Sequence, residues 1–199
     1  MVRLQSLQVV FSEVCNALSP VVQQQRCWNR VTLHHLMYRV LRERFPEMGS
    51  QMVCNAIYSV CRAARLVYQH PQSPFNVGRS GGAGEALPRL MFAVSAPVYF
   101  DRHTLSVKDG RLSMYTLDGR MHFDLALEPQ QLALFGRCRL LEVVLQGAVL
   151  SGYRLSFEFE TVATPAVSPT LKEAGMQPEL PVEHVPPHWP PYLQVETAT

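Results

Sequence analysis

The sequence predicts an α+β fold in which an N-terminal three-helix lobe precedes a small antiparallel, partly open β-barrel of the oligonucleotide-binding type. Apolar residues recur at spacings of three and four through residues 1–72, as in helices packed on one face. Apolar and polar residues alternate through much of 89–164, and two Asp-Gly turn signals lie within that stretch. The chain of 199 residues is long enough for one domain or two small ones.

The three helices are predicted from their apolar stripes and their boundaries. The second helix is expected to begin near Thr32 as its N-cap and to stop at Pro46, because proline lacks a backbone donor. The third is expected to begin with Ser50 as its cap and to end at Pro71. The first helix carries an apolar stripe made of Leu4, Leu7, Phe11, Val14, Leu18 and Val21.

Positive charge is concentrated in the helical part. Residues 1–70 hold eight arginines against three glutamates, whereas residues 71–164 are neutral and residues 165–199 are acidic. Helical spacing places Arg39 and Arg42 on one side of the second helix, and Arg62 and Arg65 on one side of the third. Both ordinary solvated faces and a phosphate-contacting surface fit this pattern.

The β-region is expected to be organised around a three-stranded meander. Asp109-Gly110 and Asp118-Gly119 supply the positive φ angles of tight hairpin turns, and alternating apolar residues flank them. A short helix over 128–135, closed by Gly136, should follow the meander. Two further strands are predicted, over 139–145 and 153–160.

Two stretches have the composition of connecting segments. Residues 73–88 are rich in glycine and proline and are expected to form a flexible linker. Residues 165–199 form a proline-rich, acidic tail without apolar periodicity, predicted to be disordered. Its polyproline-like segment 185–193 allows three interpretations: a docking segment, a strip that packs back on its own domain, or an inert tail.

No motif in the chain indicates catalysis, so we expect neither catalytic residues, nor a metal, nor a cofactor. The histidines lack metal-ligand spacing, and neither a nucleophile elbow nor a dinucleotide loop is present. The five cysteines form no C-x-x-C pair, which favours a reducing, cytoplasmic location. No apolar run is long enough to span a bilayer, so we expect no membrane partner.

The meander also carries a resemblance to a known family. Tyr99-Phe100-Asp101, the run from Leu105 to Ser113 and Thr116-Leu117-x-Gly119-Arg120 together resemble the wedge β-domain of TnpB (OrfB-type) transposon nucleases. These enzymes are relatives of the type V CRISPR effectors. The segment from Asn29 to Arg42 is similar to a helix pair of their recognition lobe. The resemblance covers about residues 5–164 and implies a grip on guide RNA and on RNA–DNA duplex through backbone shape and charge.

The chain departs from that family at both ends. Where family members continue into a nuclease domain, this sequence continues into the proline-rich tail after residue 164. The family's opening strand is also missing before the first helix, which would leave a sheet edge unpaired and available to another chain.

Two functions from different classes follow, and the first is favoured. The chain would be a non-catalytic RNA-binding subunit that holds guide-type RNA, with DNA as a second ligand, and works with a partner protein in trans. Its alternative is a protein-interaction adaptor that uses the open sheet edge, for a partner or for self-association, together with the tail; a transposon remnant is the third. In the first, phosphates and bases would be contacted by Arg39, Arg42, Arg62, Arg65, Arg111, Arg120, Tyr99 and Tyr115.

Overall fold

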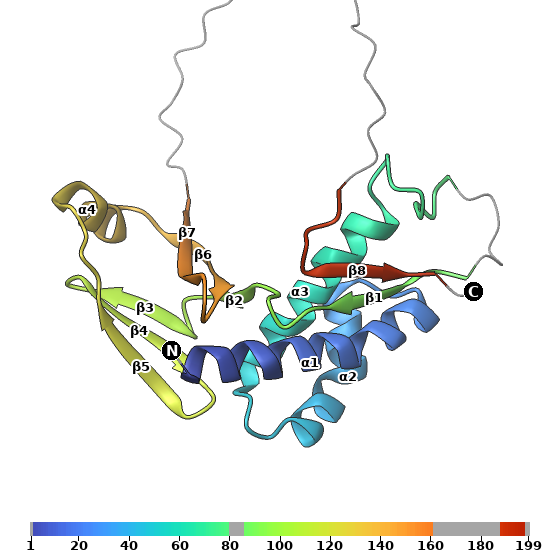
Figure 1. The fold of residues 1–199 in the computed structure, drawn as a ribbon, viewed down its shortest axis with the longest axis horizontal. Coiled ribbons are helices and arrows are strands. Elements are labelled where there is room, and N and C mark those ends of the chain that lie inside the picture. The colour runs from blue at the N-terminus through green and yellow to red at the C-terminus, as the bar shows by residue number, and fades with distance from the viewer. Residues whose placement is uncertain (1, 80–85, 161–187, 198–199) are drawn as a thin grey trace, which may run out of the picture.

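The α+β class is confirmed. The computed structural model describes residues 2–79, 86–160 and 188–197, and Figure 1 shows their arrangement. Four helices span α1 (Val2–Gln25), α2 (Arg30–Arg44), α3 (Ser50–Tyr68) and α4 (Pro129–Arg137). The strands are β1 (Arg89–Phe92), β2 (Val98–Phe100), β3 (Leu105–Lys108), β4 (Arg111–Thr116), β5 (Gly119–Asp124), β6 (Leu140–Ala148), β7 (Gly152–Phe159) and β8 (Leu193–Glu196).

The three predicted N-terminal helices are present, but their caps differ from the predicted ones. Asn29, not Thr32, caps α2, because its side chain accepts hydrogen bonds from the backbone N–H groups of Val31 and Thr32. Gly49 takes the N-cap position of α3, so that Ser50 is already helical. In α4, Gly136 lies inside the helix instead of closing it.

The predicted meander is also present. β3, β4 and β5 pair antiparallel in sequence order. Asp109 and Gly110 have φ angles of 51° and 78°, and Gly119 has a φ of 86°, as tight hairpin turns require. These turns fix a register in which Leu105 lies opposite Met114 and Leu112 opposite Phe123, on the apolar face of the sheet.

The remaining strands form two further antiparallel sheets. β6 pairs with β2 on one side and with β7 on the other, and β1 pairs with β8. α4 packs beside β7 through Phe135, whose ring centroid lies 5.2 Å from that of Phe157 and 5.0 Å from that of Phe159.

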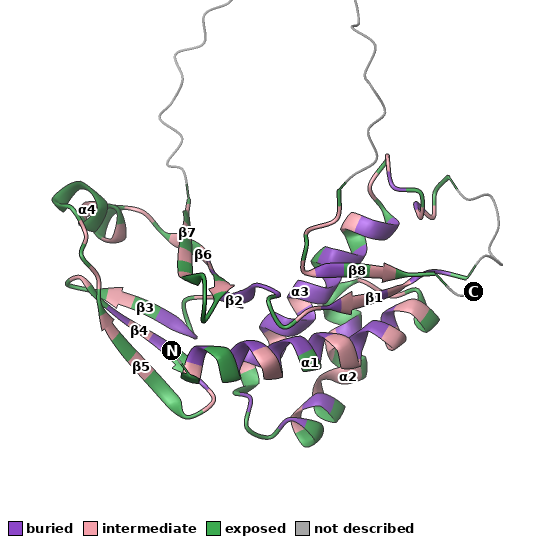
Figure 2. Ribbon diagram, viewed as in Figure 1, coloured by how far each residue is buried: buried purple, intermediate pink, exposed green. Residues whose placement is uncertain are grey.

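The predicted partly open barrel needs correction. Among the described residues the eight strands form three separate sheets, and none of them closes into a barrel. Buried residues are concentrated on α1, α3, β1 and β2, whereas α4 and β7 contain none (Figure 2). The core thus lies between the helices and the strands that touch them, and the sheets extend outward from it.

The predicted linker and tail both contain ordered pieces. Residues 73–79 are held to the end of α3, because Ser73 Oγ donates to Val67 O and Val77 N donates to Tyr68 O. In the predicted tail, β8 pairs with β1 and buries Leu193, so this part packs back on its own domain. Residues 80–85 of the linker and 165–187, 198 and 199 of the tail lie outside the described residues.

Candidate nucleic-acid interface

The outer face of the β3–β4–β5 meander gathers three of the predicted site residues. Strand pairing places Lys108 opposite Arg111 and Tyr115 opposite Arg120. On the same face, Ser113 lies between Ser106 and His122. Directly opposed residues of an antiparallel sheet project from the same face, so the three strands bring a cationic and aromatic set together.

Arg120 is held in place across this face. Its guanidinium carbon lies 4.3 Å from the centroid of the Tyr115 ring. Its Nη1 donates to Ser113 Oγ at 2.9 Å, and its Nη2 donates to His103 O at 3.3 Å. Tyr115 nevertheless keeps 41% of its surface exposed. The meander therefore presents a positioned cation and an accessible aromatic ring side by side, which suits a phosphate next to a base.

The charge on this face is predominantly positive. On the three strands this face carries three cationic side chains, those of Lys108, Arg111 and Arg120. It carries a single carboxylate, that of Asp124, which lies opposite Arg111. Asp118, in the turn after β4, is drawn toward α1 by Arg3, whose Nε lies 3.8 Å from its carboxylate. The strand residues of the outer face thus carry an excess of two positive charges, and Asp109, exposed in the turn between β3 and β4, lowers it to one.

Two of the four predicted helical arginines make contacts within the protein. Arg42 donates to Met48 O and so braces the loop between α2 and α3. Arg62 pairs with Glu142 of β6 at 3.0 Å. Arg39 is almost fully exposed and lies 3.6 Å from Glu43, one turn further along α2. Arg65 is exposed on α3. Arg42 and Arg62 therefore already make contacts within the protein. Arg39 and Arg65 remain as the predicted helical contacts to phosphate.

Tyr99 has a packing role instead of the predicted base-stacking one. It is 7% exposed, the Arg62 guanidinium lies 5.6 Å from its ring centroid, and the Tyr58 ring meets it edge-on at 5.7 Å. Asn55 Nδ2 donates to its carbonyl oxygen at 3.0 Å. Burial, and then the neighbouring hydroxyl of Tyr192, raise the pKa of Tyr99. A ring enclosed in this way is not available to an unpaired base.

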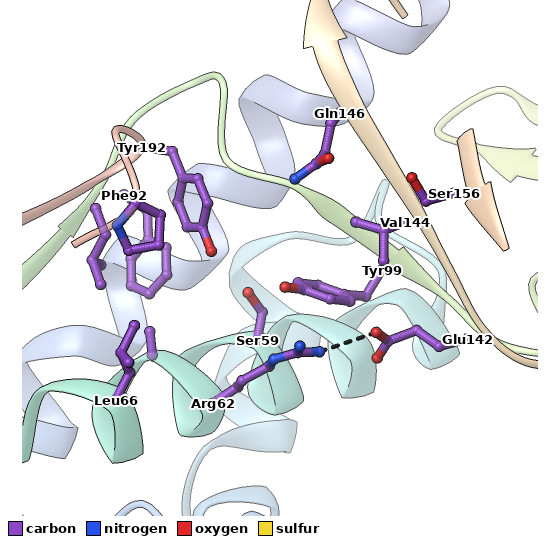
Figure 3. A pocket seen from close by; sticks show the side chains of 13 residues that line it. Ser59, Arg62, Leu66, Phe92, Tyr99, Glu142, Val144, Gln146, Ser156 and Tyr192 are labelled. Atoms are coloured by element: carbon purple, nitrogen blue, oxygen red, sulfur yellow. Dashed lines mark hydrogen bonds and ion pairs between the residues drawn. The ribbon is translucent and has the colours of Figure 1, made fainter. Parts of the chain in front are cut away.

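Arg62 and Tyr99 instead line a cleft of about 520 Å³ between α3, the β2–β6–β7 sheet and the C-terminal segment (Figure 3). Figure 3 shows Arg62 reaching Glu142 along one side and Tyr192 directed toward Tyr99 from the other. The cation is thus neutralised within the cleft, whose other lining is largely apolar, with Phe92, Leu66 and Val144 among its members. This chemistry does not favour a phosphate.

Sequence reasoning missed four residues of the meander face: Lys108, His122, Ser106 and Ser113. Their signal was present, because the two Asp-Gly turns fix the strand register and alternation then assigns each residue to a face. His122 Nε2 lies 3.2 Å from Ser113 Oγ, so the histidine joins the group that holds Arg120.

No group of three or more His, Cys, Asp or Glu side chains that could hold a metal ion occurs within 2–79, 86–160 and 188–197. In the same residues no helix has the length and apolar character needed to cross a bilayer. Comparison of the chain with protein-family models, with curated proteins and with solved structures found no match.

Proposed function

We propose that this chain is a non-catalytic nucleic-acid-binding protein whose contact surface is the outer face of β3, β4 and β5. One observation carries the proposal: strand register gathers Lys108, Arg111, Arg120, His122 and Tyr115 on a single exposed face. Guanidinium and ammonium groups bind phosphate oxygens, and an exposed tyrosine can stack on an unpaired base.

The chemistry of this face favours RNA held mainly through its backbone. The serine hydroxyls of Ser106 and Ser113 lie among the cations, where they can reach ribose or phosphate groups. The resemblance to the TnpB wedge domain agrees with a structured, guide-type RNA or an RNA–DNA duplex as the ligand. It also agrees with a partner protein that acts in trans.

The test is the affinity of the full chain for a labelled RNA hairpin with a single-stranded flank, measured by fluorescence anisotropy over a series of salt concentrations. Replacing Arg111 and Arg120 by glutamate should raise the Kd by at least about tenfold. The salt dependence should fall by about 1.5 in log–log slope, because two phosphate contacts disappear.

A charge-matched control uses two exposed arginines away from the meander. Arg79→Glu combined with Arg137→Glu changes the net charge of the protein by the same amount. An equal loss of affinity in both double variants would show that only the overall charge matters, which would overturn the meander as the contact surface. Arg39→Glu combined with Arg65→Glu separately measures what the helices contribute, without breaking the internal contacts of Arg42 and Arg62.

Tyr115→Ala separates stacking from charge. If the ring stacks on an unpaired base, this change should weaken binding of the flanked hairpin several-fold and leave a blunt duplex of the same length unaffected. Circular dichroism of each variant verifies that the fold is retained.

The second candidate function is a protein-interaction adaptor, which the strand order favours. β5 and β7 each end a sheet, so each has a strand partner on one side only among the described residues. A chain that shows no affinity for the hairpin and yet co-elutes with a stoichiometric polypeptide from its native host would support this function.

A further inference from the structure

The longest unpaired strand edge in the described residues belongs to β7. This strand spans Gly152–Phe159 and pairs with β6 alone. Its residues alternate between exposed and half-buried, and none is buried. An eight-residue edge with open backbone groups is a template for another strand unless something covers it.

The backbone alternation identifies which groups point outward from this edge. Glu160 N donates to Arg139 O on the β6 side. Along an antiparallel strand every second residue bonds to the same neighbour, so Arg154, Ser156 and Glu158 also direct their backbone groups toward β6. The N–H and C=O groups of Tyr153, Leu155, Phe157 and Phe159 therefore face away from the sheet.

The sequence of β7 is complementary to itself when it is read in the opposite direction. If Ser156 lies opposite Ser156 of a second copy, Arg154 lies opposite Glu158 of that copy, and Glu158 opposite its Arg154. On the other face, Leu155 meets Phe157 and Tyr153 meets Phe159. These last four residues are the ones whose backbone groups face outward, so the register satisfies both the side chains and the backbone.

We propose that β7 is a dimerisation strand, which pairs antiparallel with β7 of a second copy of this chain about a two-fold axis at Ser156. The two β2–β6–β7 sheets then join into one six-stranded sheet. An isologous contact of this kind closes on itself and yields a dimer instead of a filament. The inference does not depend on nucleic-acid binding.

The charges on β7 support a second copy as the occupant. Glu158 lies directly opposite Glu142 of β6, a like-charge pair that is unfavourable in an isolated sheet. Arg62 pairs with Glu142, but neither Glu158 nor Arg154 forms an ion pair within the described parts of the chain. In the dimer each Glu158 gains the guanidinium of the other copy.

Neighbouring registers are less favourable. Shifting the two-fold to Leu155 places Arg154 opposite Ser156 and leaves Glu158 opposite Gly152. Shifting it to Phe157 pairs Arg154 with Glu160 but places Glu158 opposite Ser156, and it shortens the overlap. The register centred on Ser156 is the one of the three that pairs both charges of the strand with charges of opposite sign.

The proposal is tested by sedimentation equilibrium of the full chain over a range of protein concentrations, with charge reversals at the two paired positions. The unchanged chain should form a dimer. Arg154→Glu alone or Glu158→Arg alone should raise the dimer Kd by on the order of tenfold to a hundredfold, because each replaces two attractive pairs by two repulsive ones. Arg79→Glu, at an exposed site on another segment, is the charge-matched control and should not change the dimer Kd.

Recombining the reversed charges makes the test specific for the register. In an equimolar mixture of Arg154→Glu and Glu158→Arg chains, every cross-strand pair is again of opposite sign, so a heterodimer should form with an affinity near that of the unchanged dimer. The variant with both reversals should likewise dimerise on its own. Both results distinguish strand pairing from loss of fold, since a misfolded chain could not be rescued by its counterpart.

Three outcomes would overturn the proposal. A monomer at every concentration of the unchanged chain would exclude a second copy as the partner of this edge. A dimer whose Kd is unaffected by either reversal, or single variants that fail to associate when mixed, would place the interface elsewhere or in another register.

Discussion

Tyr68 shows how one buried hydroxyl makes the fold depend on pH. The side chain is fully buried, its hydroxyl donates to Pro88 O, and its ring centroid lies 5.3 Å from that of Trp28. Burial raises the pKa of Tyr68 to about 12. The unfolded chain therefore releases this proton at a lower pH than the folded chain, and the free energy of unfolding must fall as the pH rises from about 10 to about 12.

We expect Tyr68→Phe to have two opposite effects on stability. Near pH 8 the variant should be less stable by about 1–2 kcal/mol, because Pro88 O loses its buried donor. Between about pH 10 and 12 the variant should lose less stability than the unchanged chain, by on the order of 2 kcal/mol. Urea unfolding followed by circular dichroism at a series of pH values measures both effects.

Tyr115→Phe is the matched control for that experiment, since it removes a phenol on the exposed face of the meander. Identical pH dependence in Tyr68→Phe and in the unchanged chain would show that Tyr68 is not the group responsible.

At the residue scale, sequence patterns assign faces well and assign contacts poorly. Alternation along the strands of the meander is consistent with the exposed face on which Arg111, Arg120 and Tyr115 lie. It could not show that Tyr99 is enclosed by Arg62 and Tyr58, because those residues lie on α3, some 40 positions earlier in the chain. β2 consists of three consecutive buried residues, so the strand has no alternation of apolar and polar residues from which a solvent-exposed face could be inferred.

Among the elements, α1 acts as a partner for the edge of a strand. Asn16 Nδ2 donates to Phe92 O at 2.9 Å, and Phe92 N donates to Asn16 Oδ1 at 2.7 Å. Ser19 makes the same reciprocal pair with Leu90, and Gln23 Nε2 donates to Leu87 O at 2.6 Å. Polar side chains on one helix face thus replace the backbone of a missing strand, and they satisfy β1 on the side that β8 does not cover.

Asn16→Ala should therefore destabilise the protein by about 2–3 kcal/mol, because it leaves both the N–H and the C=O of Phe92 without partners in a part-buried site. The exchange of the Phe92 amide hydrogen should also become faster than in the unchanged chain. Urea unfolding and hydrogen exchange measured by NMR check the two effects. Gln24→Ala, which alters an exposed residue of the same helix, is the control; an equal effect of both changes would point to helix propensity instead of the strand contacts.

Elements with long periodic patterns were predictable, whereas elements that depend on distant partners were not. The helices and the meander follow from local apolar spacing and from two turn signals. β8 did not, because its four residues follow a proline-rich segment and become a strand only by pairing with β1, about 100 positions earlier. The predicted caps of α2 and α3 were wrong for a simpler reason: each helix had an alternative cap within three residues of the predicted one.

For the whole molecule, the arrangement of the sheets agrees with the predicted α+β class but not with the predicted barrel. A barrel would require the meander to pair with the β2–β6–β7 sheet, but among the described residues β3 and β5 end one sheet, and β2 and β7 end the other. Strand order depends on pairings that no local pattern encodes, and so the α+β class was predictable while the closure was not. The unpaired edges that result are the surfaces on which the adaptor function and the proposed dimer depend.

The C-terminal strand β8 packs into the same core as the N-terminal helix α1. Leu193 of β8 is 4% exposed and belongs to the same apolar cluster as Leu90 and Phe92 of β1 and Phe11 of α1. Leu193→Asp should lower the free energy of unfolding by about 3 kcal/mol or more, since a carboxylate would replace a buried aliphatic side chain. Gln194→Asp adds the same charge at the next, exposed position of β8 and should cost less than about 0.5 kcal/mol. The test is urea unfolding followed by circular dichroism at a helical wavelength, because that signal comes mainly from α1, α2 and α3. A lower unfolding midpoint for Leu193→Asp alone would mean that β8 is part of the cooperative core. Equal midpoints for the two variants would mean that β8 is a peripheral strand whose loss does not destabilise the helices.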